Sequence, residues 1–119
     1  MGLDTTHNCW YGAYSGFNRF RYSLGYQIGI DLDDYLGYEG KKGKKLEDID
    51  HDLMPLFNHS DCDGILTVEE SKKIVNGLNS VLENFNEKLE YDYDFKDRII
   101  RFRDGCLDAI SQNEIVEFK

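Results

Sequence analysis

The chain has 119 residues, with 23 Asp and Glu against 14 Lys and Arg, so its formal net charge is −9 at pH 7. This length suits a single domain over residues 1–119. The acidic balance argues against a general nucleic-acid-binding protein, because neutralising phosphates needs a basic surface.

The first predicted element is a helix over about residues 9–27. Apolar residues recur there at steps of three and four, which is the period of an amphipathic helix; they are Trp10, Ala13, Phe17, Phe20, Leu24 and Ile28. Residues 29–45 are predicted to form a long surface loop, because four glycines interrupt this segment and four lysines cluster in it. Loops of this length in small domains tend to be functional or mobile.

Two helical segments are predicted in the middle of the chain. Residues 46–58 have apolar side chains at helical spacing, but Pro55 interrupts them, which predicts a short helix broken at that proline. Thr67 and Glu70 have the spacing of a capping box, in which each side chain bonds to the backbone N–H of the other residue. A helix over about 68–89 is predicted to follow this cap.

A last helix is predicted from Asp92 or Asp94, either of which could cap it, to about residue 111, with Asn113 at its end. The tail after it is predicted to be a short edge strand or a docked end, and its apolar residues are Ile115, Val116 and Phe118. Together these elements predict a mainly α fold, a compact single domain of three to four helices with one long loop.

Nothing in the sequence indicates export or membrane insertion. The N-terminus lacks the basic and apolar regions of a secretory signal, and no apolar stretch approaches the roughly 18 residues of a membrane span. The cysteines, Cys9, Cys62 and Cys106, are odd in number and widely separated, which is typical of free thiols in a reducing cytosol. A cytoplasmic location is therefore expected.

The turn before the capped helix resembles an EF-hand calcium loop. With Gly64 at the sixth position, Asp61 and Asp63 fall at the third and fifth and Glu70 at the twelfth. His59 stands at the first position, where calcium loops have Asp, and an imidazole is a poor ligand for a hard cation. We therefore favour a capped turn without a cofactor, with a calcium site as the alternative.

The first predicted helix has a polar, aromatic face beside its apolar stripe. This face is made of Tyr11, Tyr14, Ser15, Asn18, Arg19 and Tyr22, and Arg21 flanks it. Arginine presents a planar fork that matches phosphate or carboxylate, and tyrosine rings can stack on a base. The alternative is a half-buried helix, since aromatic stripes at helical spacing usually pack in the core.

Three arginines lie close together in the last predicted helix. Asp94–Arg98 and Asp97–Arg101 are spaced i, i+4, which predicts surface ion pairs for two of them. Arg103 has no opposite charge at that spacing, so it is predicted to lack a partner and is a candidate for anion binding. The alternative is that all three are solvated surface charges.

A soft-metal site is also conceivable from His7, Cys9, His59 and Cys62, which could supply four zinc ligands if the two segments met. Their spacing is not that of a standard finger or ribbon, so free thiols are favoured. No nucleophile–base pair, phosphate loop or dinucleotide fingerprint is evident. We expect a binding protein rather than an enzyme.

Three segments together resemble a family of small phage and prophage proteins; they are MGLDTTH at 1–7, FNRFR at 17–21 and HSDCDG at 59–64. The resemblance implies a phage-type protein that acts inside a bacterial host. Small phage proteins of this size often counter host defence by binding a host protein or by sequestering a nucleotide signal. The family supplies context, and no activity is carried over from it.

The preferred hypothesis is a pocket where the first helix meets the turn before Gly64. The N-terminus of the capped helix favours anions, and Asp61 could accept hydrogen bonds from a ribose or a base. The predicted ligand is small, anionic and nucleotide-like and is bound without turnover. Its predicted contacts are Tyr11, Tyr14, Asn18, Arg21, His59, Ser60, Asp61 and Arg103.

Two other functions stay open at this point. One is an EF-hand-like metal-binding module that uses Asp61, Asp63 and Glu70. The other is an acidic interaction module that inhibits a host protein, because acidic surfaces steer toward basic partners. No membrane and no nucleic-acid polymer is expected as a partner, and homo-oligomerisation is left open.

Overall fold

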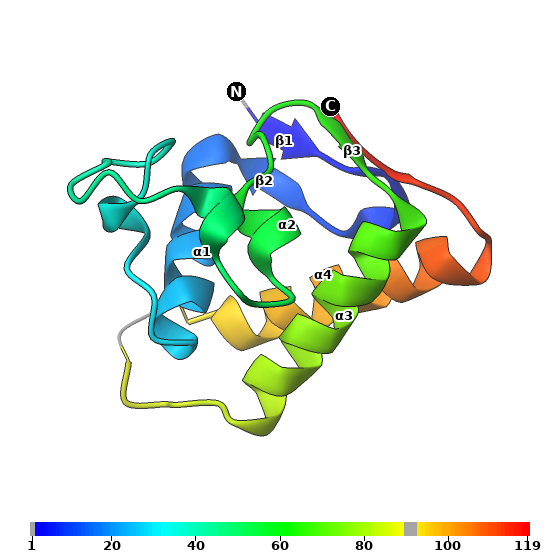
Figure 1. Ribbon diagram of the computed structural model, residues 1–119. Helices are drawn as coiled ribbons and strands as arrows, with labels where there is room; N and C mark the ends of the chain where they lie inside the picture. Colours follow the sequence, from blue (N-terminus) through cyan, green and yellow to red (C-terminus); the bar gives the residue numbers. More distant parts are fainter. Residues whose placement is uncertain (1, 90–92) are drawn as a thin grey trace.

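The computed structural model describes residues 2–89 and 93–119, and its core is built on two long helices. These helices, α3 (Val68–Glu83) and α4 (Phe95–Ser111), pack against each other (Figure 1). Their apolar stripes are buried, as the periodicity predicted; the buried residues include Ile74, Val75, Leu78, Val81, Ile99, Phe102, Cys106 and Ala109.

Two further helices complete the helical part of the fold. α1 (Tyr14–Gln27) packs against α4, and the single-turn helix α2 (Met54–Phe57) packs against α3. The rings of Phe17 and Phe20 stack on the ring of Phe102 with centroids 6.4 and 6.0 Å apart, which fixes α1 relative to α4. None of the helices in the described part of the chain has the length and apolar character that crossing a bilayer requires.

Four short strands form a small sheet region that the sequence did not predict as a whole. β1 (Gly2–Asp4) pairs antiparallel with β2 (Tyr11–Ala13), and β3 (Gly64–Leu66) pairs antiparallel with β4 (Val116–Phe118). A bridge between Thr5 and Phe118 joins the two pairs and brings the two ends of the chain together (Figure 1). The prediction of one compact domain with four helices is confirmed, and the mainly α description is corrected by these strands. The tail, predicted to be an edge strand or a docked end, is the strand β4, which pairs with β3 and is also bridged to Thr5.

The start of the first helix is a correction. Residues 9–13 are not helical, because the backbone there pairs with the N-terminal strand. The N–H of Thr5 donates to the Trp10 carbonyl (3.1 Å), and the N–H of Trp10 donates to the Thr5 hydroxyl (2.9 Å). Backbone pairing with the preceding N-terminal segment therefore overrides a helical apolar period over these residues, and Tyr11 leaves the helix for β2.

The middle of the chain is more ordered than predicted. The 29–45 segment is a loop, but it contains a 3-10 turn at Leu32–Asp34 and a bridge between Tyr35 and Lys44. Pro55 does not break a longer helix; it lies in the first turn of α2, where its missing N–H costs nothing. Residues 46–58 therefore fold as a 3-10 turn at Leu46–Asp48 followed by α2.

The ends of α3 and α4 agree only in part with the prediction. α3 ends at Glu83 rather than near residue 89, since the backbone of Asn86 exchanges two hydrogen bonds with the side-chain amide of Gln27 (3.0 and 3.1 Å). Asp94 precedes α4 without capping it, and Asp92 lies outside the described residues. Asn113 ends the last helix with a left-handed φ of 55°, as predicted.

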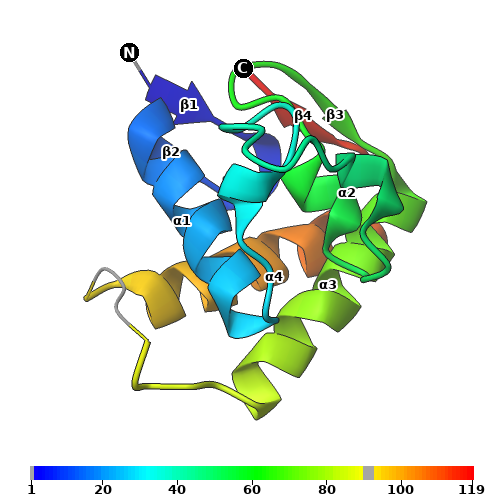
Figure 2. The ribbon, with the colours of Figure 1, turned by 60° about the vertical axis from the view of Figure 1, so that its left-hand side comes forward.

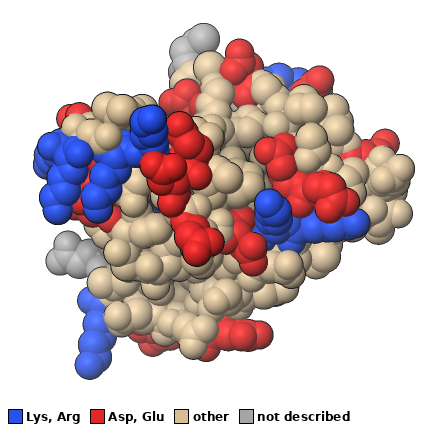
Figure 3. Space-filling model, in the orientation of Figure 1, with Lys and Arg blue, Asp and Glu red and all other residues tan. Residues whose placement is uncertain are grey.

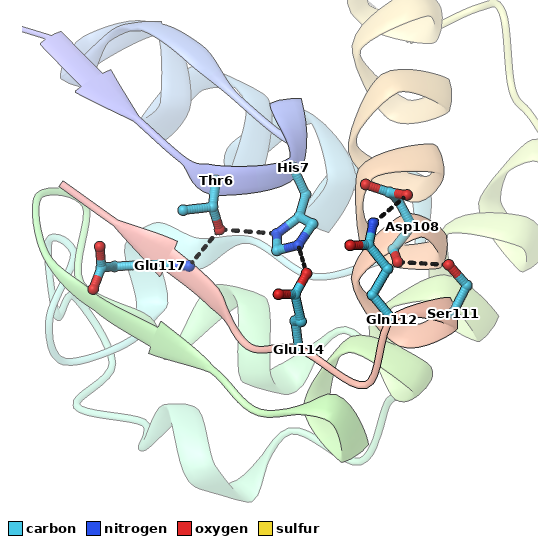
Figure 4. A network of polar contacts seen from close by, with 7 residues as sticks. All are labelled: Thr6, His7, Asp108, Ser111, Gln112, Glu114 and Glu117. Atoms are coloured by element: carbon cyan, nitrogen blue, oxygen red, sulfur yellow. Dashed lines mark hydrogen bonds and ion pairs between the residues drawn. The ribbon is translucent and has the colours of Figure 1, made fainter.

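A polar network holds the N-terminal turn on the C-terminal segment (Figure 4). The hydroxyl of Thr6 accepts a hydrogen bond from the N–H of Glu117 (2.9 Å). It also lies 2.9 Å from Nδ1 of His7, whose Nε2 is 3.0 Å from a carboxylate oxygen of Glu114. These bonds keep both termini beside the end of α4.

Charge is unevenly distributed over the surface. Figure 3 shows basic side chains gathered over the 29–45 loop, with acidic side chains spread over the rest of that face. The amines of Lys41 and Lys42 each lie 3.7 Å from a carboxylate, that of Asp33 and that of Asp34. The loop lysines are therefore partly neutralised by the loop itself.

Candidate functional site

A pocket of about 470 Å³ lies where α1, the 37–39 part of the loop and residues 57–61 meet. Figure 2 shows the loop running beside α1 and α2. Five residues of the predicted ligand site line this pocket; they are Asn18, Arg21, His59, Ser60 and Asp61. The first helix and the turn therefore meet as the sequence predicted.

Arg21 forms the inner wall of this pocket. Its side chain is only 4% exposed. Its Nη1 donates to the carbonyl oxygen of His59 (2.6 Å) and, at the limit of hydrogen bonding, to that of Leu56 (3.5 Å). Its Nη2 donates to the side-chain oxygen of Asn18. Arg21 thus ties α1 to the segment that follows α2.

Aromatic rings enclose the same guanidinium. Its carbon lies 4.6 Å from the ring centroid of Phe17 and 5.2 Å from that of Tyr38, a distance at which cation–π attraction operates. The hydroxyl of Tyr38 donates to the carbonyl oxygen of Phe57 (2.9 Å) and so fastens the loop over the pocket. Burial raises the pKa of Tyr38 to about 12, although the Arg21 charge acts in the opposite direction.

The positive charge of Arg21 has no counter-ion in the described structure. No carboxylate of residues 2–89 or 93–119 lies within 4.0 Å of the guanidinium, and its Nε has no hydrogen-bond partner there. Burial lowers the pKa of Arg21 from its ordinary value, with Tyr38 and Asp61 opposing the shift. A buried charge is costly unless it is paired, so this wall of the pocket favours an anion.

His59 sits at the rim of the pocket with both ring nitrogens engaged. Nδ1 lies 2.8 Å from the carbonyl oxygen of Ser60, and Nε2 lies 2.9 Å from that of Ile65. The ring packs on Phe118 with centroids 4.0 Å apart. Gly64 adopts a φ of 98°, which favours glycine and lets the chain fold back around the imidazole.

The outer part of the pocket is acidic. Asp61 is half-buried and has no hydrogen-bond or ion-pair partner among the described residues, and Glu39 is exposed. Tyr22 also lines the pocket and donates its hydroxyl to Asp33 (2.6 Å); burial and this bond raise its pKa. The site therefore combines a buried cation with hydrogen-bond acceptors at its mouth, which suits a ligand that is anionic at one end and rich in donors at the other.

Three predicted ligand residues lie elsewhere. Tyr11 is on β2 and is 68% exposed, and Tyr14, at the start of α1, is not among the residues that line the pocket. Arg103 was predicted to lack a partner, and this is wrong. Its Nη2 pairs with the carboxylate of Asp104 (3.0 Å) and its Nη1 donates to the side-chain oxygen of Asn79 (3.3 Å), an amide brought in by helix packing.

Of the other two arginines of α4, one forms the ion pair that was predicted for it and the other does not. Arg98 pairs with Asp94 at 2.9 Å, as predicted. Arg101 instead donates to the carbonyl oxygen of Asn8 (3.0 Å), and no ion pair joins it to Asp97 in the described structure. A second pocket, of about 220 Å³, is lined by Arg98 together with the Asp94 that pairs with it. The pocket at Arg21 is therefore the stronger candidate.

The metal alternatives gain no support from the geometry. A carboxylate oxygen of Glu70 accepts from the N–H of Thr67 (2.9 Å) and the Thr67 hydroxyl accepts from the N–H of Glu70 (3.1 Å), so the capping box forms as predicted. In residues 2–89 and 93–119, no group of three or more His, Cys, Asp or Glu side chains is arranged to hold a metal ion. Of the soft-metal candidates, His7 is bonded to Glu114 and Cys9 is buried.

Sequence reasoning missed the loop side of the pocket. Tyr38 and Glu39 come from a segment without periodicity, and only the aromatic residues in an otherwise polar loop hinted at an anchor. Tyr22 was predicted to lie on the polar face of the first helix, but it was not predicted to contact the ligand. Their positions depend on how the loop docks on α1 and α2, which is a long-range contact.

A comparison of the chain with protein-family models, with curated proteins and with solved structures found no match in any of the three. The resemblance to small phage proteins therefore stays a hypothesis, and the function must be argued from the pocket itself.

Proposed function

We propose that the protein binds and sequesters a small anionic, nucleotide-like ligand in the pocket at Arg21. The observation that carries this proposal is a guanidinium that is almost fully buried, lacks a carboxylate partner among the described residues and lines a pocket of about 470 Å³. Ligand pockets commonly span about 300–1,000 Å³, so the volume suits a molecule the size of a mononucleotide.

The recognition chemistry follows from the donors that the protein leaves unused. Arginine has five N–H donors, and the described structure engages three of them. The Asn18 amide accepts from Arg21 through its oxygen, which leaves its NH₂ group free for the ligand. A phosphate or carboxylate accepts from these groups, while Asp61 accepts from hydroxyl or amine groups at the other end. Charge-assisted bonds of this kind are strong and directional.

The wider role that we propose is that of a phage-type protein in the bacterial cytosol that withholds a nucleotide signal from host defence. This role rests on the family resemblance and on the proposal that the pocket binds its ligand without turnover. The competing role is inhibition of a host protein through the acidic surface.

The substitution Asn18→Asp tests the anion site with little change of shape. An Asp side chain at this position can accept the same bond from Arg21, and it supplies the counter-ion that the guanidinium lacks. The measurement is calorimetric titration with inorganic phosphate and with cyclic and linear mononucleotides. We expect a ligand to bind wild type, and Asn18→Asp to weaken it about tenfold or more, since the loss of a charge-assisted contact costs roughly 1.5–3 kcal/mol.

Asn79→Asp is the matched control, because Asn79 bonds to Arg103 in the same way but outside the pocket. It should leave binding unchanged. The proposal fails if no probe binds wild type below millimolar concentration, or if Asn18→Asp and Asn79→Asp bind equally well. The protein-interaction role would then be preferred.

A further inference from the structure

The hydrogen bonds of His59 can all form in only one protonation state. Its Nδ1 faces the carbonyl oxygen of Ser60 at 2.8 Å and its Nε2 faces that of Ile65 at 2.9 Å. A carbonyl oxygen only accepts hydrogen bonds, so both ring nitrogens must donate. A neutral imidazole carries a proton on one nitrogen only, and the imidazolium carries a proton on both.

We propose that protonation of His59 orders one wall of the Arg21 pocket and so makes ligand binding pH-dependent. The doubly protonated ring clamps Ser60 to Ile65 across the turn. The backbone carbonyl oxygen of His59 itself accepts the short bond from Arg21 (2.6 Å). His59 is thus a positioning residue, since it holds the segment that receives the guanidinium. The effect on the ligand rests on the proposed function.

Deprotonation removes one of the two clamping bonds. The carbonyl that is released then faces a nitrogen lone pair, and residues 60–65 lose part of their restraint. A less ordered wall costs binding free energy, because the ligand must then order it. Anion binding should therefore weaken as the pH rises.

The charged groups around His59 come from three elements. Arg21 of α1 contacts its carbonyl oxygen, and Asp61 and Asp63 flank it in its own turn. Glu117 of β4 pairs through its carboxylate with the amine of Lys119, the residue after the strand, at 3.7 Å. β3 (Gly64–Leu66) carries no charged residue. In the described structure no carboxylate forms an ion pair with the imidazole, so the two carbonyl oxygens are the polar partners of its ring nitrogens.

The first test uses the protein without ligand. Nitrogen-15 NMR of the histidine rings between pH 5 and 8 reports the protonation of each nitrogen. Amide hydrogen exchange, expressed as the protection factor against the intrinsic rate at the same pH, reports the order of residues 60–66. We expect a doubly protonated His59 ring and high protection factors at pH 5.5, with lower protection factors at pH 8. His59→Gln should abolish this pH dependence of protection, because glutamine does not titrate in that range.

His51→Gln is the matched control, because Nδ1 of His51 accepts from the N–H of Leu53 (3.0 Å) and this residue lines a different pocket. It should preserve the pH dependence of the protection factors at residues 60–66. A neutral His59 ring at pH 5.5, or protection factors that depend on pH equally in His59→Gln, overturns the inference.

The second test measures binding of cyclic mononucleotides, whose single phosphodiester charge does not change between pH 5 and 8. We expect wild type to bind about fivefold more tightly at pH 5.5 than at pH 8, the effect of about one hydrogen bond, and His59→Gln to bind equally at both. Binding that is independent of pH in wild type overturns the inference and leaves the proposed function standing. Absence of binding at both pH values defeats the proposed function, and the NMR and exchange measurements then decide the role of His59.

Discussion

Replacing Arg21 by Met tests whether the buried guanidinium holds the pocket together. Met keeps an unbranched chain beside Phe17 and Tyr38 but removes the charge and every donor. The carbonyl oxygen of His59 then loses a charge-assisted bond of 2.6 Å, a contribution of about 1.5–3 kcal/mol. The contact to Leu56, at 3.5 Å, contributes little.

We expect Arg21→Met to lower the free energy of unfolding by about 2–4 kcal/mol, because a carbonyl behind the pocket is left without its partner. Typical domains have only about 5–15 kcal/mol of stability, so the loss is easily measured as a lower midpoint of urea unfolding at an unchanged slope. Arg103→Met is the control. It should cost about 1 kcal/mol or less, since that guanidinium bonds to Asn79 and Asp104 near the surface.

The opposite result would refute this reasoning. Arg21→Met could be as stable as wild type or more stable. The desolvation cost of burying the charge would then exceed the stabilisation that its hydrogen bonds provide. The pocket would then not be organised around the arginine, and its anion preference would have to come from other groups.

Three further predictions concern the core and the titration of the pocket. Gly105→Ala should lower the free energy of unfolding by about 1–3 kcal/mol in urea unfolding, because a Cβ atom there would lie 2.6 Å from the Cys9 sulfur. Leu78→Ala and Phe102→Ala should each cost about 2–5 kcal/mol, since both side chains are fully buried; wild-type-like thermal unfolding of either variant would contradict this. The pKa of Tyr38 is raised from its ordinary 10.0 to about 12, so the hydroxyl should stay protonated up to about pH 12. The stability that this raised pKa confers is complete below pH 10 and is lost as the pH rises from 10 to about 12. The difference in tyrosinate absorbance between wild type and Tyr38→Phe measures this titration.

The sequence by itself determined the features that depend on neighbours within one or two helical turns. The capping box of Thr67 and Glu70, the buried stripes of α3 and α4 and the end of the last helix at Asn113 all appear as predicted. Helix periodicity and capping act between residues three or four positions apart. These signals can therefore be read without knowing the rest of the fold.

The predicted meeting of the first helix with the 59–61 turn was correct, but the contacts that make it a site came only from the tertiary structure. The carbonyl partners of Arg21 lie 35 and 38 residues away, and Arg103 finds Asn79 24 residues away. Residues 9–13 show a related limit at shorter range, since β2 pairs with a strand that lies 7 to 11 residues earlier, beyond the three- and four-residue spacing of a helical stripe. A side chain's spacing fixes which face of an element it lies on, while the partner that it meets is fixed by packing between elements far apart in the chain.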